Sequence, residues 1–147
     1  MPHRILFIDD QEVILFAMRE YFTTLGYEVD CASELEEAEI LIGQHAYALV
    51  VADLRLTGSS GTEGLEIVKT VRAYRPDTRV IMLTAYGSPE IEAEARRRGV
   101  DAFLHKPKPL AEVAQLASRL LKGDVPVNGE AVRAGGVRAL RIPDGRN

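Results

Sequence analysis

Two apolar runs in the first third of this chain each lead directly into acidic residues. Residues 5–8 are followed by Asp9 and Asp10, and residues 48–52 are followed by Asp53. Parallel strands that are buried on both faces have continuous apolar sequences of this kind. Ligands of open α/β sheets bind where the carboxyl ends of such strands meet. The two runs therefore predict that three carboxylates share one edge of a sheet.

Two later apolar runs end in other polar side chains, Thr84 and Lys106. On the same reasoning, a hydroxyl and an ammonium group join the three carboxylates at that edge. Oxygen ligands of this kind suit magnesium, which usually takes one or two carboxylates, and an aspartate can itself accept a phosphoryl group. Pro107 follows Lys106, and we expect the bond between them to be cis, as in tight turns at functional sites.

The apolar runs alternate with amphipathic segments, a pattern that predicts a doubly wound parallel α/β fold of five strands with helices on both faces. The expected strands are residues 4–8, 27–32, 46–54, 79–84 and 102–105. The expected helices are residues 11–25, about ten residues after Ser33, 64–74, 89–98 and 110–121.

Local signals support several of these helices. Ser33 with Glu36 forms a capping-box pattern, and Ser88-Pro89 predicts an N-cap followed by a proline in the first turn. The apolar residues of the first helix that recur near a 3.6-residue spacing are Val13, Phe16, Ala17, Tyr21 and Leu25.

The 147 residues are most simply one domain over residues 1–122 with a tail over 123–147, which we expect to be disordered or a short hairpin. Residues 122–147 hold five basic and three acidic side chains, so the body carries the negative net charge. That balance argues against nucleic-acid binding. No run is long enough to cross a membrane, and the single cysteine, Cys31, favours a reduced, cytoplasmic setting.

The acidic pair, the central aspartate and two later dipeptides together resemble the receiver domain of bacterial two-component response regulators, over residues 4–121. The matching residues are Asp9-Asp10, Asp53, Thr84-Ala85 and Lys106-Pro107. The resemblance implies a flavodoxin-like five-stranded sheet in the order 2-1-3-4-5. It also implies a regulatory phosphoacceptor domain that is not an enzyme acting on external substrates, although it can catalyse its own phosphorylation and dephosphorylation.

The resemblance further implies roles for individual residues. Asp53 would be the phosphoacceptor, and Thr84 and Lys106 would hold the phosphoryl group. A magnesium or manganese ion would be bound by Asp9, Asp10, Asp53 and the backbone carbonyl of Arg55. Thr84 and Phe103 would form the switch.

The partners that the resemblance implies are proteins. The phosphoryl group would come from the phosphohistidine of a sensor histidine kinase or a phosphotransfer protein. Phosphorylation would pull Thr84 toward the phosphate and turn Phe103 inward, changing the surface formed by residues 89–98, 102–105 and 110–121. That surface would contact a downstream protein effector or form a homodimer.

The loop after Asp53 departs from the family pattern. Thr57 stands where the family usually has proline, and the loop Thr57–Gly64 is about three residues longer than usual. Arg55 and Tyr86, which flank the expected phosphoryl site, are bulky, and we predict that they slow the attack of water on the aspartyl phosphate.

Two other functions share part of this pattern. Residues 53–57 resemble the D-x-D-x-[TV] signature of haloacid dehalogenase phosphatases, but Arg55 replaces the second aspartate and cannot act as an acid or base, because its guanidinium stays protonated. A flavodoxin-like flavin binder would share the topology, but this chain has Asp9 and Asp10 where a phosphate-binding loop is needed.

Overall fold

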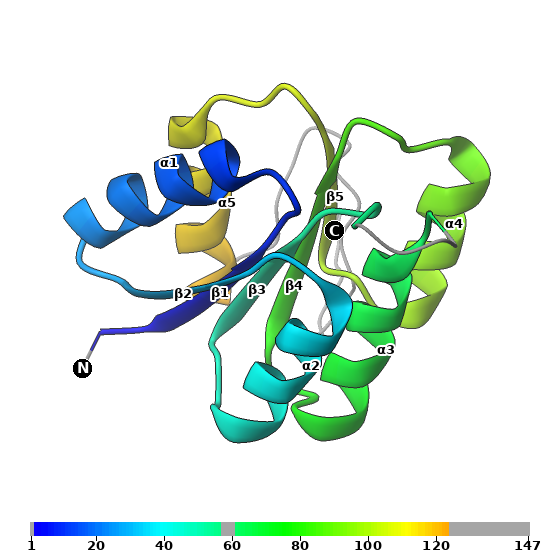
Figure 1. The fold of residues 1–147 in the computed structure, drawn as a ribbon, viewed down its shortest axis with the longest axis horizontal. Coiled ribbons are helices and arrows are strands. Elements are labelled where there is room, and N and C mark those ends of the chain that lie inside the picture. Colours follow the sequence, from blue (N-terminus) through cyan, green and yellow to red (C-terminus); the bar gives the residue numbers. More distant parts are fainter. Residues whose placement is uncertain (1, 57–60, 124–147) are drawn as a thin grey trace, which may run out of the picture.

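The computed structural model of this chain describes residues 2–56 and 61–123, and the tail expected beyond them lies outside the described residues. Its strands are β1 (Arg4–Ile8), β2 (Glu28–Ala32), β3 (Leu49–Ala52), β4 (Arg79–Thr84) and β5 (Ala102–His105). They form one parallel sheet in the order β2-β1-β3-β4-β5, which confirms the predicted fold class and strand order (Figure 1).

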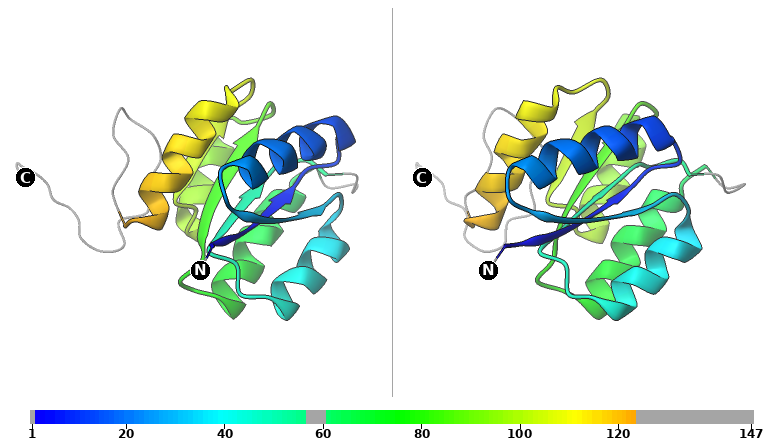
Figure 2. Two further views of the ribbon diagram at one scale, coloured as in Figure 1. Left: turned by 90° about the vertical axis from the view of Figure 1, so that its left-hand side faces the viewer. Right: turned by 60° about the vertical axis from the view of Figure 1, so that its left-hand side comes forward.

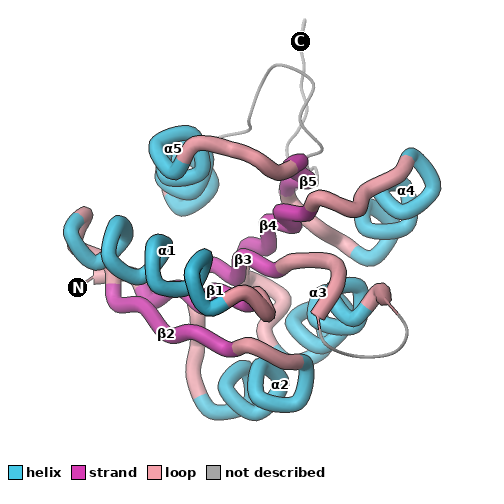
Figure 3. The backbone as a smooth tube through the Cα atoms, turned by 45° about the horizontal axis from the view of Figure 1, so that its top comes forward, coloured by secondary structure: helices cyan, strands magenta, loops and turns pink. Residues whose placement is uncertain are grey.

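Five helices connect and cover the strands in the described part of the chain. They are α1 (Glu12–Thr24), α2 (Leu35–Gln44), α3 (Glu63–Tyr74), α4 (Pro89–Arg98) and α5 (Leu110–Leu121). Helices α1 and α5 cover one face of the sheet, and α2, α3 and α4 cover the other (Figures 2 and 3). No helix among the described residues is long and apolar enough to span a membrane.

The strands contribute side chains to two hydrophobic cores, because successive side chains of a strand point to opposite faces of the sheet. In β1, Ile5 and Phe7 pack in the core under α1 and α5, whereas Leu6 and Ile8 pack in the core under the other three helices. All four side chains are at most 2% exposed. Burying a side chain of this size contributes about 1.5–3 kcal/mol, so the sheet needs helices on both faces, and the continuous apolar runs follow from that.

The sheet register sets the two acidic strand ends beside each other. Ile8 pairs with Ala52 across β1 and β3. Immediately beyond this pair, the backbone N–H of Asp53 donates to the carbonyl of Ile8 at 2.9 Å, and the N–H of Asp9 donates to Ala32 at 3.1 Å. These backbone hydrogen bonds hold both aspartates at the same edge of the sheet, as the sequence predicts.

The second half of the chain follows its predicted boundaries closely. The bounds of β4, β5, α4 and α5 are those expected from the sequence. The predicted cap of α4 is confirmed, because the hydroxyl of Ser88 accepts a hydrogen bond from the N–H of Ile91 at 3.2 Å and Pro89 opens the helix.

The apolar face predicted for the first helix is wrong in part. Val13 and Phe16 are 80% and 67% exposed, and the residues that α1 buries are Leu15, Met18 and Phe22. Helix α1 carries two apolar stripes, so its periodicity alone does not say which stripe faces the sheet. The stripe that includes Phe22 faces the sheet, where the Phe22 ring packs in the core, and the other stripe is exposed to solvent.

The predicted capping box of the second helix is also wrong. The N-cap of α2 is Glu34, which makes no side-chain cap hydrogen bond. The helix begins one residue later than expected, so the carboxylate of Glu37, and not that of Glu36, accepts the hydrogen bond from the Ser33 N–H, at 3.0 Å.

A buried ion cluster holds the opposite edge of the sheet together. Asp101, which is fully buried just before β5, lies 2.9 Å from the guanidinium of Arg72 in α3 and 3.1 Å from that of Arg79 at the start of β4. Its carboxylate also accepts from the Val80 N–H at 2.8 Å. The charge is therefore both paired and hydrogen-bonded, which is the condition under which a carboxylate is tolerated in a protein interior.

Replacing Asp101 should destabilise the fold strongly. We expect Asp101→Asn to lower the free energy of unfolding by about 3 kcal/mol, because removing one member of a buried pair leaves the other charge uncompensated. Urea unfolding at neutral pH measures this. The control is Glu112→Gln, whose exposed carboxylate lies 3.9 Å from Lys108 and should change stability by about 0.5 kcal/mol or less. Equal effects of the two substitutions would contradict the assignment.

Candidate functional site

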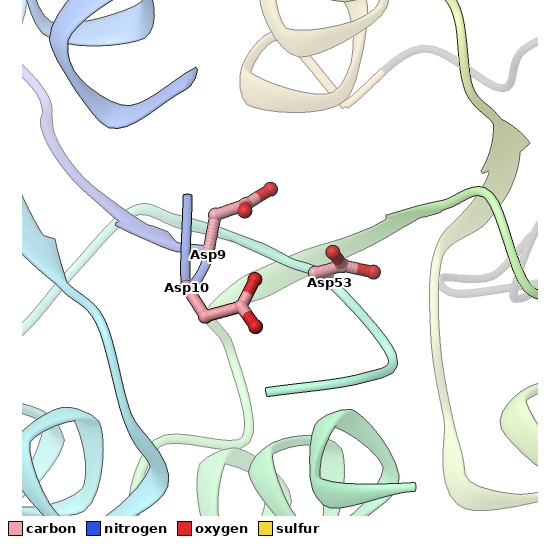
Figure 4. A group of neighbouring side chains, drawn as sticks. All are labelled: Asp9, Asp10 and Asp53. Atoms are coloured by element: carbon pink, nitrogen blue, oxygen red, sulfur yellow. The ribbon is translucent and has the colours of Figure 1, made fainter. Parts of the chain in front are cut away.

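Three carboxylates meet at the carboxyl ends of β1 and β3. Asp9, Asp10 and Asp53 each offer an oxygen, and these oxygens all lie within 4.8 Å of one another. Figure 4 shows Asp9 and Asp10 at consecutive positions after β1, with Asp53 beside them. Asp9 and Asp53 are only 5% and 4% exposed, whereas Asp10 is partly exposed. The convergence predicted from the strand ends is therefore present.

The ammonium group of Lys106 bridges two of these acids. Its Nζ lies 2.7 Å from Asp9 Oδ2 and 3.1 Å from Asp53 Oδ2. The Lys106–Pro107 peptide bond is cis, as predicted. Burial alone would lower the pKa of Lys106, but the hydrogen bonds to Asp9 and Asp53 outweigh it, so the pKa lies above its ordinary value. The lysine is therefore a permanent positive charge at this edge of the sheet.

The two buried aspartates differ in how their oxygens are satisfied. Asp9 Oδ1 accepts from the backbone N–H of Gln11 at 2.9 Å, and Asp9 Oδ2 accepts from Lys106. Asp53 Oδ1 is buried and has no hydrogen-bond partner among the described residues. Since a buried oxygen without a partner is costly, Asp53 Oδ1 is the atom of this site that most needs a ligand.

This arrangement suits a hard divalent cation. Magnesium binds through one or two carboxylates and keeps several waters. Asp53 has an oxygen to spare and Asp10 is within reach of it, whereas both oxygens of Asp9 already accept hydrogen bonds. The residues therefore fit a cation held directly by Asp10 and Asp53, with Asp9 acting through water.

Burial raises the pKa of Asp9 above its ordinary value. Loss of solvation is the largest cause, and the hydrogen bonds from Lys106 and Gln11 offset it only in part, while the charge of Asp53 adds to the rise. Burial thus makes the charged form of Asp9 costly in this site, and a bound cation would favour that charged form.

The loop between β3 and α3 is held by a buried acid that the sequence patterns do not identify. Glu63 is 4% exposed, and its carboxylate accepts from the N–H of Leu56 at 3.2 Å and from the N–H of Gly61 at 3.4 Å. An acid in the first turn of a helix is usually interpreted as a favourable charge near the positive end of the helix dipole. The sequence alone therefore does not indicate that the Glu63 side chain points into the protein. Thr57 lies outside the described residues.

Helix α3 starts in direct contact with the backbone that carries Asp53. The N–H of Gly64 donates to the carbonyl of Leu54 at 2.8 Å. A Cβ at position 64 would overlap the backbone oxygen of Asp53 and come within 2.7 Å of Leu54 Cα. Only glycine allows this close approach, so Gly64 lets the start of α3 lie directly against the backbone of Asp53.

The loops after β3 and β4 meet through an aromatic contact. The guanidinium carbon of Arg55 lies 4.3 Å from the centre of the Tyr86 ring. The predicted site residue Thr84 is fully buried, and its hydroxyl accepts from the N–H of Tyr86 at 3.1 Å. In this conformation Thr84 therefore fixes the turn that carries the tyrosine.

The aromatic ring expected to switch is already inside the protein. Phe103 is 3% exposed and belongs to the core under α2, α3 and α4. The ring lies against Gly87, where an added Cβ would come within 2.8 Å of Phe103 Cε1. The ring therefore already occupies the inward position that we predicted for the phosphorylated state. Gly87, which has no side chain, leaves room for the ring there.

Comparisons with known proteins agree on one family. The family model described as the response regulator receiver domain matches residues 5–118. Sporulation initiation phosphotransferase F of Bacillus subtilis is 28% identical over 121 residues, which are 82% of this chain and 95% of that protein. Other curated relatives are longer than this chain. The chain spans 27% of the length of one response regulator and 62% of the length of two photosynthetic apparatus regulatory proteins.

Two solved structures show the same likeness. A CheY-like response regulator receiver domain protein from Methanospirillum hungatei JF-1 is 28% identical, with a TM-score of 0.80, and the match covers 84% of this chain and 96% of that one. A response regulator protein from Burkholderia pseudomallei, solved with a phosphorylated aspartic acid, a calcium ion and citrate, is 28% identical with a TM-score of 0.71, covering 82% and 72% of the two chains.

The raised pKa of Asp9 predicts a pH-dependent effect of Asp9→Asn. Protonated Asp9 favours folding at pH values below its unfolded pKa, and this contribution is lost as the pH rises through the higher folded pKa. In EDTA, Asp9→Asn should therefore gain stability relative to the wild type as the pH rises from about 4 toward 7. Urea unfolding at several pH values measures the difference. A difference that shrinks as the pH rises would contradict the prediction.

Proposed function

The chain belongs to the response regulator receiver family, and from this premise we propose that it is a phosphorylation-dependent signalling switch in which Asp53 accepts the phosphoryl group. The observation that carries the proposal is the state of the Asp53 carboxylate, which is buried, is held by Lys106 through one oxygen and has no described partner for the other. Receiver domains obtain phosphate from a sensor histidine kinase or a phosphotransfer protein.

The proposed reaction is a transfer from nitrogen to oxygen. A carboxylate oxygen of Asp53 forms a bond to phosphorus while the phosphorus–nitrogen bond to the donor's phosphohistidine breaks, and the electron pair of that bond returns to the imidazole ring. The product is an aspartyl phosphate. Lys106 Nζ, already within 3.1 Å of the acceptor carboxylate, places a positive charge where the phosphoryl oxygens arrive.

Asp10, Asp53 and the backbone carbonyl of Arg55 would hold a magnesium or manganese ion, with Asp9 acting through water. When bound, the ion supplies positive charge against the transferring phosphoryl group, and charge neutralisation is most of what this kind of transfer requires.

We assign the conformational response to Thr84 and Phe103. In the switched state, the Thr84 hydroxyl would leave the Tyr86 N–H and donate to a phosphoryl oxygen. Since the Phe103 ring already lies inward, phosphorylation would raise the population of this inward position and not create it, as expected for an equilibrium between pre-existing conformations.

We propose residues 1–122 as the receiver domain and the face formed by α4, β5 and α5 as its output surface. A downstream protein effector or a second copy of the chain would bind there. Phe103 belongs to β5, and the β4–α4 loop leads from Thr84 into α4, so a change at Thr84 would be passed to this face through them.

The two alternative functions are less well supported. In a haloacid dehalogenase phosphatase, position 55 would hold an acid directed at the leaving group, but here Arg55 stacks on Tyr86. A flavin phosphate would have to lie against Asp9, Asp10 and Asp53, where negative charges would repel it.

The proposal predicts a single phosphate adduct on Asp53. After incubation with acetyl phosphate and Mg²⁺, intact-mass analysis should show an increase of about 80 Da, because one phosphoryl group is added to one carboxylate. The adduct should disappear in Asp53→Asn and when EDTA replaces Mg²⁺. It should persist in Asp77→Asn, which removes an exposed carboxylate elsewhere. An adduct that survives in Asp53→Asn would sink the proposal.

The contact between Arg55 and Tyr86 predicts a longer lifetime of the aspartyl phosphate. An exposed cation–π contact is worth about 0.5–1 kcal/mol, which corresponds to a roughly two- to five-fold lower population of the open state that admits water. We therefore expect Arg55→Ala and Tyr86→Ala each to speed loss of phosphate by about that factor.

The decay of the phosphorylated mass after removal of acetyl phosphate measures this lifetime. Tyr74→Ala is the matched control, because Tyr74 is a similarly exposed aromatic residue at the end of α3. If all three variants lose phosphate at the wild-type rate, the contact does not shield the site. Arg55→Lys should fall between the wild type and Arg55→Ala, since lysine keeps a cation for the ring but loses the planar stacking.

A further inference from the structure

The peptide group between Arg55 and Leu56 is held from one side by a buried carboxylate. Glu63 Oε1 accepts from the N–H of Leu56 at 3.2 Å, in a buried hydrogen bond between residues seven positions apart. The second oxygen of Glu63 accepts from Gly61. The carboxylate thus ties the start of the β3–α3 loop to its end, and the first turn of α3 carries it.

This hydrogen bond also determines where the carbonyl of Arg55 points. The N–H of Leu56 and the C=O of Arg55 belong to one planar peptide group. The bond is trans, because Lys106–Pro107 is the cis bond found among the described residues. In a trans peptide the two dipoles point in opposite directions, so an N–H fixed on Glu63 directs the carbonyl oxygen away from Glu63. Turning the carbonyl toward Glu63 would therefore break the hydrogen bond.

We propose that Glu63 is a positioning residue for the divalent cation, acting through the Arg55 carbonyl, an inference that rests on the proposed metal site. By holding the Leu56 N–H, the carboxylate sets the orientation of the peptide group that supplies this oxygen. A hydrogen bond to the N–H also polarises the carbonyl and makes its oxygen a better ligand. Groups that orient metal ligands in this way typically change metal affinity 10- to 100-fold when they are replaced.

The length of the Glu63 side chain is the feature that this role requires. The loop from residue 57 to 60 separates the two ends that Glu63 joins, and Gly64 pins the helix against the Asp53 backbone. With the backbone of residue 63 held in this way, Glu63 Oε1 lies 3.2 Å from the Leu56 nitrogen. An aspartate keeps the charge but is one methylene shorter. A glutamine keeps the reach and an oxygen acceptor for the Leu56 N–H, but it loses the charge and the acceptor for the Gly61 N–H.

These two substitutions separate positioning from simple electrostatic attraction. Binding of Mn²⁺ alone, without phosphate, can be followed by the loss of the electron paramagnetic resonance signal of the free ion. If Glu63 positions the carbonyl, Glu63→Asp should weaken Mn²⁺ binding at least about tenfold, whereas Glu63→Gln should stay within about threefold of the wild type. If its charge alone matters, the order reverses. Glu66→Gln, which removes an acid one turn further along α3, controls for the loss of charge.

A second measurement reports on the contact itself. The amide proton of Leu56 should be shifted by its bond to the Glu63 carboxylate in the wild-type NMR spectrum, and the shift should be lost in Glu63→Asp. Thermal unfolding of each variant shows whether it is folded. Should Glu63→Asp fail to fold, the folded Glu63→Gln variant is decisive when both measurements are made on it. A tenfold loss of affinity, or retained affinity with the Leu56 shift lost, overturns the inference, whereas retention of both supports it.

The outcomes distinguish this inference from the function on which it rests. If the wild type binds no Mn²⁺ and gives no adduct on Asp53, the proposed function fails and the inference fails with it. If the wild type binds Mn²⁺ and is phosphorylated while Glu63→Asp binds equally well, only the role of Glu63 is refuted.

Discussion

The contact of Lys106 with Asp9 and Asp53 is the interaction on which the site depends. Two like charges about 4 Å apart repel by about 4 kcal/mol at an effective dielectric constant of 20, and the parallel register leaves the acids no freedom to move apart. The ammonium group, 2.7 and 3.1 Å away, offsets part of this repulsion. Two features of the acids remain: burial holds the pKa of Asp9 above its ordinary value, and Asp53 Oδ1 has no described partner. A bound cation would satisfy this oxygen and favour the charged form of Asp9.

Each edge of the sheet holds a buried aspartate paired with basic side chains, but the two aspartates differ in how completely they are paired. At one edge, two arginines and a backbone N–H pair with both carboxylate oxygens of Asp101, so neither oxygen needs a ligand. At the other edge, Asp53 receives one lysine, which it shares with Asp9. The buried Asp101 thus has a complete set of partners, whereas the proposed phosphoacceptor keeps one oxygen without a described partner.

The sequence predicted five strands, their order and the convergence of three acids, although β3 (Leu49–Ala52) is shorter than the expected residues 46–54. The reason is simple. Parallel strands buried on both faces have continuous apolar sequences, and the polar residue after each one must lie at the same edge. The prediction failed where two local patterns compete. Helix α1 has two apolar stripes, and the stripe carrying Phe16 stays outside. The capping pattern at Ser33 was displaced by one residue, because Glu37 is the acid that reaches its N–H.

Glu63 and Gly64 could not have been found from local patterns, because their roles depend on what lies across the loop. An acid at the start of a helix and a glycine after it are ordinary in sequence. In the fold, the glycine brings α3 against the backbone of Asp53, and the acid reaches back to Leu56. A longer loop has more conformations to lose on folding, so it needs an internal contact of this kind if its first residues are to stay in one orientation.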